Sequence, residues 1–295
     1  MAFLIKWCGN TSGWFFHYSI IPIFHHSRLC YSNTPVVVSL MRFSVLASGS
    51  GGNACYIETG QTRLLIDAGL SCSECVKRLN SLGVNPASLE GLLITHEHVD
   101  HIRGAGTLAR RLRIPVYINN ATFRRGMRSL GNLSQPVIIR TGQPMMVKDL
   151  LVETFTKCHD AADPMGIVVT WQGVRLGVIT DLGRSTPVVE ARLTGCHALV
   201  MEFNHDERML EEGPYPLEVK RRIRGPDGHL SNGQAKDLLM CLSHQELRWV
   251  VPAHLSETNN LPEKALRMSK AALVNSKTRV TLSGQGAPTP MIDLG

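Results

Sequence analysis

The sequence lacks clustered cysteines, and it has no apolar run of the roughly 18 residues that a membrane span requires. Its 8 cysteines are scattered over 295 residues. This spacing excludes the dense disulfide framework of a small secreted domain and favours a reducing, cytoplasmic location. Cys72 and Cys75 form a single C-x-x-C pair. A structural zinc site built on such pairs needs a second one, so we interpret both as helix residues.

Acidic residues are absent from the first forty positions, where residues such as Asn10 and Pro22 also break the apolar stretches. A secretory signal needs a basic start, a continuous apolar stretch and a small-residue cleavage site, which this segment does not offer. A clean strand pattern begins directly after Met41. We therefore predict that residues 1–40 are an N-terminal extension, or the product of a misassigned start, and that residues 41–295 form one domain.

Nucleotide-binding loops of the G-x-x-x-x-G-K-[ST] type are also absent, so the Gly-rich segment 48–53 is not a P-loop. Glycines there would instead let the backbone lie close to a site. The chain is 43% hydrophobic, which suffices for a sizeable core. Its net charge of +7 suits an acidic partner such as nucleic acid, although a solvated surface gives the same value.

Short strand patterns alternate with helical ones from Met41 onward. Segments rich in Val, Ile and Leu and bounded by turn residues are predicted strands. They are 42–47, 54–58, 62–67, 91–95, 115–118, 151–156, 166–171, 174–180, 197–203, 248–252 and 278–282. Helices are predicted over 231–243, where Ser231 and Gln234 fit a capping box, and over 261–273. Hairpins first and helices interspersed indicate an α/β fold with mixed sheets and outer helices.

The densest group of metal-binding residue types follows the apolar segment 91–94. It reads Thr95-His96-Glu97-His98-Val99-Asp100-His101. Neutral imidazole nitrogens and a carboxylate oxygen suit zinc or a similar divalent ion. Four such residues cannot all point at one ion, because His96 and His98 face one way from an extended backbone and Asp100 and His101 turn away after it. The spacing therefore predicts two ions.

Three later residues have the same local setting, because each follows directly on an apolar strand pattern. They are His159, Asp181 and His254. Alone, each histidine would be interpreted as a hydrogen-bonded residue of the core or its rim. Two ions need about three more ligands than the first cluster supplies, so together with that cluster we interpret all three as metal ligands.

The order H-x-H-x-D-H, a later His, an Asp after a strand and a final His resembles the ligand set of the metallo-β-lactamase superfamily. The segments 48–53, 159–164, 228–232 and 253–256 further resemble the YycJ/WalJ-like branch, which is related to RNase Z. The match covers about 41–295. It implies a four-layer αββα sandwich in which two mixed sheets are flanked by helices, and a hydrolase activity for this domain.

The resemblance also implies which ligands share an ion. His96, His98 and His159 would hold one metal, Asp100, His101 and His254 the other, and Asp181 would bridge them. The implied cofactors are two divalent ions, Zn or Mn. Two such ions can share a hydroxide as nucleophile and clamp the attacked group, which suits phosphodiesters but also thioesters and lactams.

Residues outside the ligand set favour phosphodiesters. RNase Z-like enzymes pair a Glu after the bridging-Asp strand with a His at a helix start, and the two help to protonate the leaving oxygen. The matching residues are Glu202 and His229, which implies His229 as general acid or phosphate contact, oriented by Glu202. Asp100 is the third residue that we predict to be catalytic. The predicted substrate contacts are Ser50, Asn53, Ser231, Asn232, Arg222 and Arg224.

Basic clusters lie at 110–113, 124–128 and 220–224. The third precedes His229, where a nucleic-acid backbone would pass, and phosphate contacts of this kind set affinity and its salt dependence. The function that the YycJ/WalJ-like resemblance implies is a two-metal 5′–3′ exonuclease on DNA. Two alternatives stay open: a small-molecule hydrolase of cyclic or ribose phosphodiesters, lactones or thioesters, and a metal-containing regulatory protein.

Overall fold

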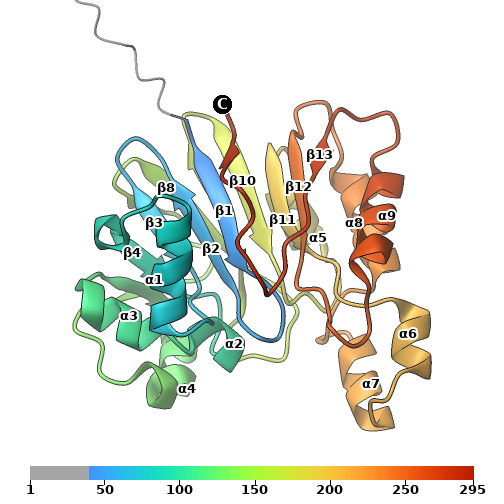
Figure 1. Ribbon diagram of the computed structural model, residues 1–295, viewed down its shortest axis with the longest axis horizontal. Helices are drawn as coiled ribbons and strands as arrows, with labels where there is room; N and C mark the ends of the chain where they lie inside the picture. Colours follow the sequence, from blue (N-terminus) through green and yellow to red (C-terminus); the bar gives the residue numbers. More distant parts are fainter. Residues whose placement is uncertain (1–39) are drawn as a thin grey trace, which may run out of the picture. The chain divides into compact units, whose positions relative to one another are not determined.

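Two sheets packed face to face organise the protein. The computed structural model describes residues 40–295 (Figure 1). Each sheet has seven strands, and helices cover the outer face of both. The predicted αββα sandwich is therefore confirmed. The predicted extension lies outside the described residues, except for its last position. Within residues 40–295, no helix has the length and apolar character needed to cross a membrane.

The first sheet has the strand order β14-β1-β2-β3-β4-β5-β6. Its strands are β1 (Arg42–Ala47), β2 (Ala54–Glu58), β3 (Arg63–Ile66), β4 (Gly91–Leu93), β5 (Val116–Asn119), β6 (Pro136–Ile139) and β14 (Ile292–Asp293). β1, β2 and β3 pair antiparallel, whereas β3 to β6 are parallel to one another. The carboxyl ends of β3, β4 and β5 therefore meet at one edge of the sheet.

The second sheet has the order β13-β12-β11-β10-β9-β8-β7. Its strands are β7 (Met145–Val147), β8 (Leu150–Thr156), β9 (Met165–Trp171), β10 (Val174–Ile179), β11 (Ala198–Glu202), β12 (Trp249–Ala253) and β13 (Arg279–Val280). β10 to β13 are parallel, and β9 runs antiparallel to both β8 and β10. The carboxyl ends of β8, β10, β11 and β12 thus lie at one edge.

The helices form the two outer layers. They are α1 (Cys72–Ser81), α2 (Val99–Ile102), α3 (Ala105–Leu112), α4 (Asn120–Leu130), α5 (Pro187–Leu193), α6 (Glu207–Glu212), α7 (Leu217–Arg224), α8 (Asn232–Leu242) and α9 (Pro262–Ala272), with a 3₁₀ turn at Pro86–Ser88. Figure 1 places α1 to α4 beside the first sheet and α5, α8 and α9 beside the second. Each sheet is thus covered by the helices that connect its own strands.

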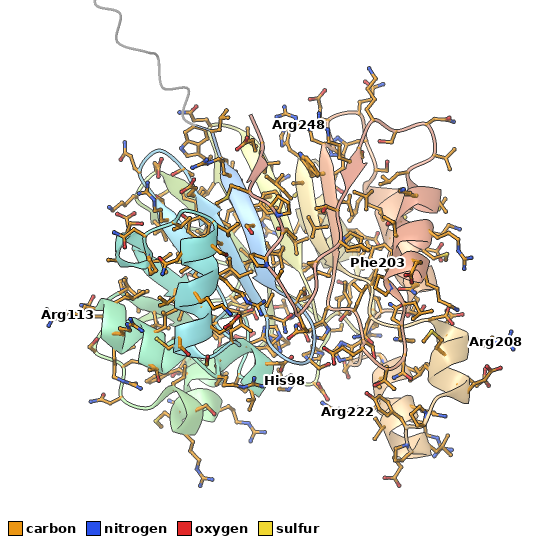
Figure 2. All side chains as sticks on the ribbon, viewed as in Figure 1. His98, Arg113, Phe203, Arg208, Arg222 and Arg248 are labelled. Atoms are coloured by element: carbon orange, nitrogen blue, oxygen red, sulfur yellow. The ribbon has the colours of Figure 1, made fainter. Side chains whose placement is uncertain are left out.

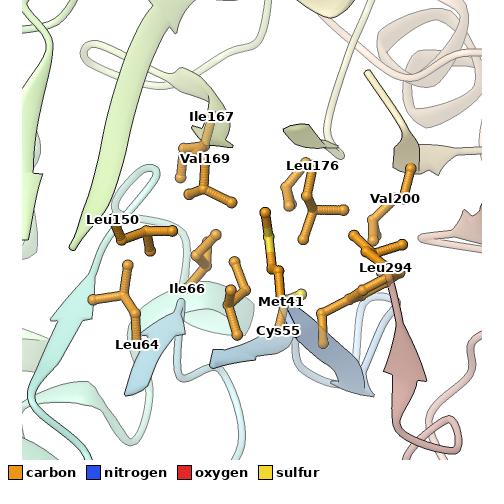
Figure 3. Close-up of a cluster of buried hydrophobic side chains, with 14 of the residues drawn as sticks. Met41, Cys55, Leu64, Ile66, Leu150, Ile167, Val169, Leu176, Val200 and Leu294 are labelled. Carbon is orange, nitrogen blue, oxygen red and sulfur yellow. The ribbon is translucent and has the colours of Figure 1, made fainter. Parts of the chain in front are cut away.

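Alternating side chains fill the spaces between layers. In β2, Cys55 and Ile57 point into the core between the sheets, whereas Ala54 and Tyr56 pack toward α1 and α3. This follows from the two-residue period of a strand. Figure 3 shows the inter-sheet core, where Ile66 of the first sheet lies among residues from both sheets. Each fully buried aliphatic side chain contributes roughly 1.5–3 kcal/mol.

Three short strands were not predicted, namely β6, β7 and β14. The side chains of β6 are mostly exposed and its first residue is Pro136, a composition that does not indicate a strand. β7 has 3 residues and β14 has 2, too few for a period to be read. All three are held by pairing with a neighbouring strand, which a local pattern does not contain.

The predicted helices 231–243 and 261–273 correspond to α8 and α9, and each is one residue shorter at both ends in the structure. Ser231 accepts a hydrogen bond from the backbone N–H of Gln234, whose side chain accepts one in return from the Ser231 N–H. α9 begins after Leu261 without a side-chain cap. Cys72 and Cys75 lie in α1, as expected, and Cys75 is fully buried there.

Candidate metal centre and active site

The predicted ligands converge where the carboxyl ends of the strands meet. Segment 96–101 follows β4, His159 follows β8, Asp181 follows β10 and His254 follows β12. Their side chains form two groups whose candidate ligand atoms lie within 4.8 Å of one another. One group is His96, His98 and His159, and the other is Asp100, His101, Asp181 and His254. The structure therefore brings all seven residues together.

In the first group, three imidazole rings surround one point. The ring centres of His96 and His98 lie 4.7 Å apart, and those of His98 and His159 lie 4.9 Å apart. His159 Nε2 is 3.2 Å from His98 Nδ1. His159 Nδ1 faces the carbonyl of Gly228 at 3.2 Å, which leaves Nε2 as the free nitrogen. Such a set of neutral nitrogens suits a divalent metal.

The second group combines nitrogen and oxygen atoms. Asp100 Oδ2 lies 3.7 Å from His101 Nε2 and 3.6 Å from His254 Nε2. Asp181 lies between the two groups. Its Oδ1 is 3.3 Å from His254 Nε2 and 3.8 Å from His159 Nε2, while its Oδ2 is 3.1 Å from His101 Nε2. A carboxylate in this place can contact ions in both groups.

Unpartnered buried atoms indicate that the pocket is built for cations. His96 Nε2, His254 Nε2 and Asp181 Oδ2 are buried and make no hydrogen bond to any atom of residues 40–295. Buried polar atoms without partners are costly and rare in native proteins. Because all three belong to the predicted ligands and face the same pocket, the residues present fit two divalent ions. The clusters are consistent with a dinuclear metal site.

The two ligand groups differ in the charge that their surroundings favour on the histidines. Burial and the neighbouring charges of His101 and Lys157 hold the pKa of His96 well below its usual value. Burial likewise lowers the pKa of His159 to about 4. For His101, burial is outweighed by Asp181 and Asp67, which raise its pKa to about 10. His96 and His159 of the first group thus offer neutral imidazoles, whereas the carboxylates around His101 in the second group stabilise positive charge.

Asp67 is a site residue that sequence analysis missed. It follows β3, and its Oδ2 lies 2.8 Å from His101 Nδ1. Its carboxylate also accepts hydrogen bonds from the N–H and the hydroxyl of Thr95. Asp67 therefore orients His101 so that Nε2 faces Asp181. The signal was present, since an Asp directly after an apolar strand is the setting that identified Asp181.

The backbone is strained at three of these positions. Asp67, Asp181 and His254 have φ values of 58°, 54° and 55°, in the left-handed region that non-glycine residues seldom adopt. All three follow a strand and turn a side chain into the centre. Strain of about 1–3 kcal/mol per residue persists only where the surrounding structure imposes it, and it clusters at functional sites.

Glu202 is the buried carboxylate that links the cluster to His229. Its Oε1 lies 2.9 Å from His229 Nδ1 and 3.0 Å from His254 Nδ1. It also accepts hydrogen bonds from the backbone N–H groups of Asp181, Leu182 and Leu230. Burial would raise the pKa of Glu202, but both histidines outweigh it and hold the pKa far below its usual value. Glu202 therefore stays ionised.

The Glu202→Gln variant is expected to lose about 3 kcal/mol of unfolding free energy. The amide would replace an acceptor with a donor that faces other donors, and His254 would lose its orienting contact. Chemical denaturation of the purified variant measures this loss. Glu153→Gln, which alters a carboxylate paired with Arg192 near the surface, is the matched control and should cost under about 1 kcal/mol. Equal losses in both variants would refute the role given to Glu202.

His229 stands at the mouth of the centre. Its ring lies 5.1 Å from that of His254 and 5.2 Å from that of His159. Its side chain is 19% exposed, so it is open to solvent on one side. Glu202 occupies Nδ1, and Nε2 makes no hydrogen bond with the described residues. The structure thus places the predicted pair in contact, with one nitrogen of His229 free.

The predicted substrate contacts divide into exposed and buried residues. Ser50 is exposed on the Gly-rich loop. Ser231 and Asn232 are 2% and 3% exposed. The hydroxyl of Ser231 caps α8, and the amide of Asn232 pairs with that of Asn260. The prediction that these two side chains touch substrate is therefore corrected, because both are used inside the protein.

Asn53 is also buried, but it acts on a ligand. Its Nδ2 lies 3.2 Å from Asp100 Oδ2 and 3.0 Å from His101 Nε2. Its backbone N–H donates to the carbonyl of Asp100. This close approach needs Gly69, where a Cβ would lie 1.6 Å from the Asp100 carbonyl oxygen. Asn53 thus positions Asp100, and the expected contact with substrate is replaced by this support.

The third basic cluster is split by the structure. Arg222 Nε lies 2.6 Å from Asp160 Oδ2, beside the first ligand group. Lys220, Arg221 and Arg224 instead line a surface hollow of about 330 Å³ with Glu211 and Leu217. Figure 2 places Arg222 on the same side of the molecule as His98, whereas Arg113 of the first cluster lies at the outer margin. Arg222 is therefore the member of the cluster that borders the metal centre.

Known proteins of similar sequence are found over most of the chain. A model of the beta-lactamase superfamily domain matches residues 62–255. Exodeoxyribonuclease YycJ of Bacillus anthracis is 39% identical over 241 residues, which cover 80% of this chain and 90% of that protein. Exodeoxyribonuclease WalJ of Streptococcus pneumoniae is 33% identical over 228 residues, covering 76% of this chain and 85% of that protein.

Solved structures of distant sequence share the fold. The metallo-beta-lactamase fold protein YhfI of Bacillus subtilis superposes with a TM-score of 0.67 at 15% identity, covering 85% of this chain and 99% of that one. Zn²⁺-bound PqqB of Methylobacterium extorquens gives a TM-score of 0.63 at 16% identity, with coverage of 84% and 99%. At these identities the likeness concerns the fold alone.

Proposed function

Because the chain belongs to the metallo-β-lactamase superfamily and is a metal-dependent hydrolase related to exodeoxyribonucleases, we propose that it degrades DNA from the 5′ end as a two-metal exonuclease. The observation that carries the proposal is its 39% identity to an exodeoxyribonuclease, over 90% of that protein's length. The complete ligand set, of which five residues are buried, and Arg222 beside it support the same assignment. DNA is the proposed substrate.

The metal centre would supply the nucleophile. When bound, two divalent ions there would activate a water molecule and stabilise the charge that develops on the attacked phosphate. His96, His98 and His159 would hold one ion, and Asp100, His101 and His254 the other, with Asp181 between them. Three imidazoles in one group favour zinc, and the carboxylates of the other group also suit manganese.

Neighbouring polar side chains fix the orientation of these ligands. Asp67 accepts a hydrogen bond from His101 Nδ1–H, and Glu202 accepts one from His254 Nδ1–H, so each ring presents Nε2 to the centre. Asn53 holds Asp100 in the same way. A preorganised set of this kind needs no rearrangement when charge develops on the substrate.

His229 would protonate the leaving oxygen. Glu202 fixes its Nδ1 and stabilises the imidazolium, while Nε2 faces the open side of the site, where the leaving group would depart. In each turnover Nε2 would give a proton to the 3′-oxygen of the released nucleotide and regain one from solvent. Arg222, Arg224 and the exposed Ser50 would contact phosphates of the strand.

Degradation of a 5′-phosphorylated DNA duplex tests the proposal. We expect a 5′ label to be released at once as a mononucleotide, whereas a 3′ label should remain on strands that shorten with time. Treatment with a chelator should abolish both signals, and added Mn²⁺ or Zn²⁺ should restore them. An RNA duplex of the same sequence is the matched substrate control.

Two results would contradict the proposed function. Release of the 3′ label first would reverse the polarity. A protein with two metal ions per chain and no activity on any nucleic acid would point instead to a small phosphodiester, lactone or thioester. Salt separates these classes as well, because contacts with a DNA backbone weaken steeply as the salt concentration rises.

A further inference from the structure

Asp160 is a site residue to which neither the ligand set nor the proposed acid assigns a task. It follows His159 directly, and its side chain is 32% exposed at the rim of the centre. Its Oδ1 lies 3.5 Å from His159 Nε2 and 3.9 Å from His98 Nε2. Its Oδ2 accepts a hydrogen bond from Arg222 Nε at 2.6 Å. One carboxylate thus touches both the first ligand group and the cation from α7.

The contact leaves most of the guanidinium free. Within residues 40–295, the Arg222 side chain makes its polar contact through Nε alone, and it is 65% exposed. The two terminal amino groups therefore keep donors in the planar arrangement that matches two phosphate oxygens. A guanidinium held by Nε has its plane fixed while that edge stays open to a ligand.

The backbone around this pair is also tied to the site. The N–H of Asp160 donates to the carbonyl of Asp227 at 3.0 Å, and the N–H of His229 donates to the carbonyl of Ile223 at 2.9 Å. Gly228 allows this packing, since a Cβ there would lie 2.2 Å from the carbonyl oxygen of Arg222. All residues of α7 are at least partly exposed, so these links at its carboxyl end are what place Arg222.

We propose that Asp160 is a positioning residue, which fixes the Arg222 guanidinium beside the first ligand group so that its terminal amino groups bind a phosphate of the substrate strand. The inference rests on the proposed function and deepens it. A neutral lactone or thioester has no group for this fork. A polyanionic strand has one at every nucleotide, so the pair selects phosphodiester chains among the substrates that two metals can hydrolyse.

Steady-state cleavage of a 5′-phosphorylated duplex tests this coupling. Asp160→Asn and Arg222→Gln should each raise KM by about tenfold, because a charge-assisted contact to phosphate is lost or misplaced. Their kcat should change by less than about twofold. The double variant should be no worse than Arg222→Gln alone, since the carboxylate acts only through the guanidinium. Arg222→Lys should resemble Arg222→Gln, because one ammonium cannot bind Asp160 and present a planar fork.

A second ion pair provides the matched control. Arg208 Nε lies 2.8 Å from Glu212 Oε1 on α6, the same type of contact, and Figure 2 shows Arg208 at the outer margin of the molecule. Arg208→Gln and Glu212→Gln remove the same charges, so they should leave KM within about twofold. Metal content and melting temperature are measured for every variant.

Three results would overturn the inference. The first is an unchanged KM in Asp160→Asn beside a raised KM in Arg222→Gln. The second is a double variant in which the two effects on KM multiply. Loss of a metal ion from Asp160→Asn would make Asp160 a ligand instead. A duplex with phosphorothioate links that resist cleavage separates this inference from the proposed function. If the wild-type protein binds this DNA but cleaves no DNA, the proposed function fails, and the changes in Kd across the same variants decide the inference. If it neither binds nor cleaves DNA, the proposed function and the inference both fail.

Discussion

The Asp181→Asn variant is expected to bind fewer than two metal ions per chain and to degrade DNA roughly 10³-fold more slowly or worse. Metal ions contribute several kcal/mol of transition-state stabilisation, and each 1.4 kcal/mol corresponds to about tenfold in rate. Asp181 is 1% exposed, and among residues 40–295 it is the one carboxylate whose oxygens lie near ligands of both groups. Its loss should therefore disturb both ions at once.

Asparagine is the appropriate replacement because it separates charge from shape. It has nearly the same volume as aspartate, and it tolerates the left-handed backbone that Asp181 adopts at φ 54°. The amide leaves one oxygen where two carboxylate oxygens stood, and it brings an N–H₂ group toward the free nitrogens of His101 or His254. The variant should therefore fold, but it should bind fewer than two metal ions per chain.

Metal analysis by mass spectrometry, together with the duplex assay, checks this expectation. Asp237→Asn removes one negative charge from the exposed face of α8 and should keep two ions and full activity. An Asp181→Asn protein with two bound ions and near-normal rates would refute the bridging role. Unfolded protein would be recognised by its circular dichroism, and Asp100→Ala, at a less buried ligand, would then take its place in the same assay.

Local patterns were sufficient for the strands that carry the site. β1 and β2 have the predicted bounds, and β8, β10, β11 and β12 differ from prediction by one residue at some ends. These strands are long apolar segments between turn residues, so their period is visible in the sequence. Helix α7 could not be foreseen in this way, because this exposed helix is placed by contacts with Gly228 and Asp160 rather than by an apolar stripe.

The ligands were predictable because each carries its own chemistry at a strand end. Supporting residues were harder to assign. Asn232 and Ser231 looked like substrate contacts because polar residues at a helix start can bind phosphate, yet the same residue types cap helices and pair inside the protein. Asp67 and Asp160 were missed because their roles depend on partners far away in the chain, His101 and Arg222, which only the folded structure brings to them.

Substitution of His229 should slow the chemical step without disturbing the metal centre. His229→Ala is expected to lower kcat for DNA by about 10²–10⁴-fold, the usual contribution of a general acid, while both metal ions remain bound. A substrate whose leaving group is p-nitrophenolate should be affected far less, because that anion departs without a proton. The p-nitrophenyl ester of thymidine 5′-monophosphate, assayed beside the duplex, provides this comparison. His244→Gln, which alters a histidine bonded to the Cys196 carbonyl away from the cluster, should change neither rate.

The pattern of losses assigns the role of His229. If Nε2 of the Glu202-paired ring donates the proton, the defect appears in kcat for DNA. It is then far smaller with p-nitrophenolate, because that leaving group needs no proton. If it only binds phosphate, KM rises for both substrates and kcat is preserved. If it is instead a metal ligand together with Asp181, Glu202 and His254, whose candidate ligand atoms lie within 4.8 Å of one of its nitrogens, a metal ion is lost as well. Only the first outcome agrees with a general acid whose proton reaches the departing oxygen.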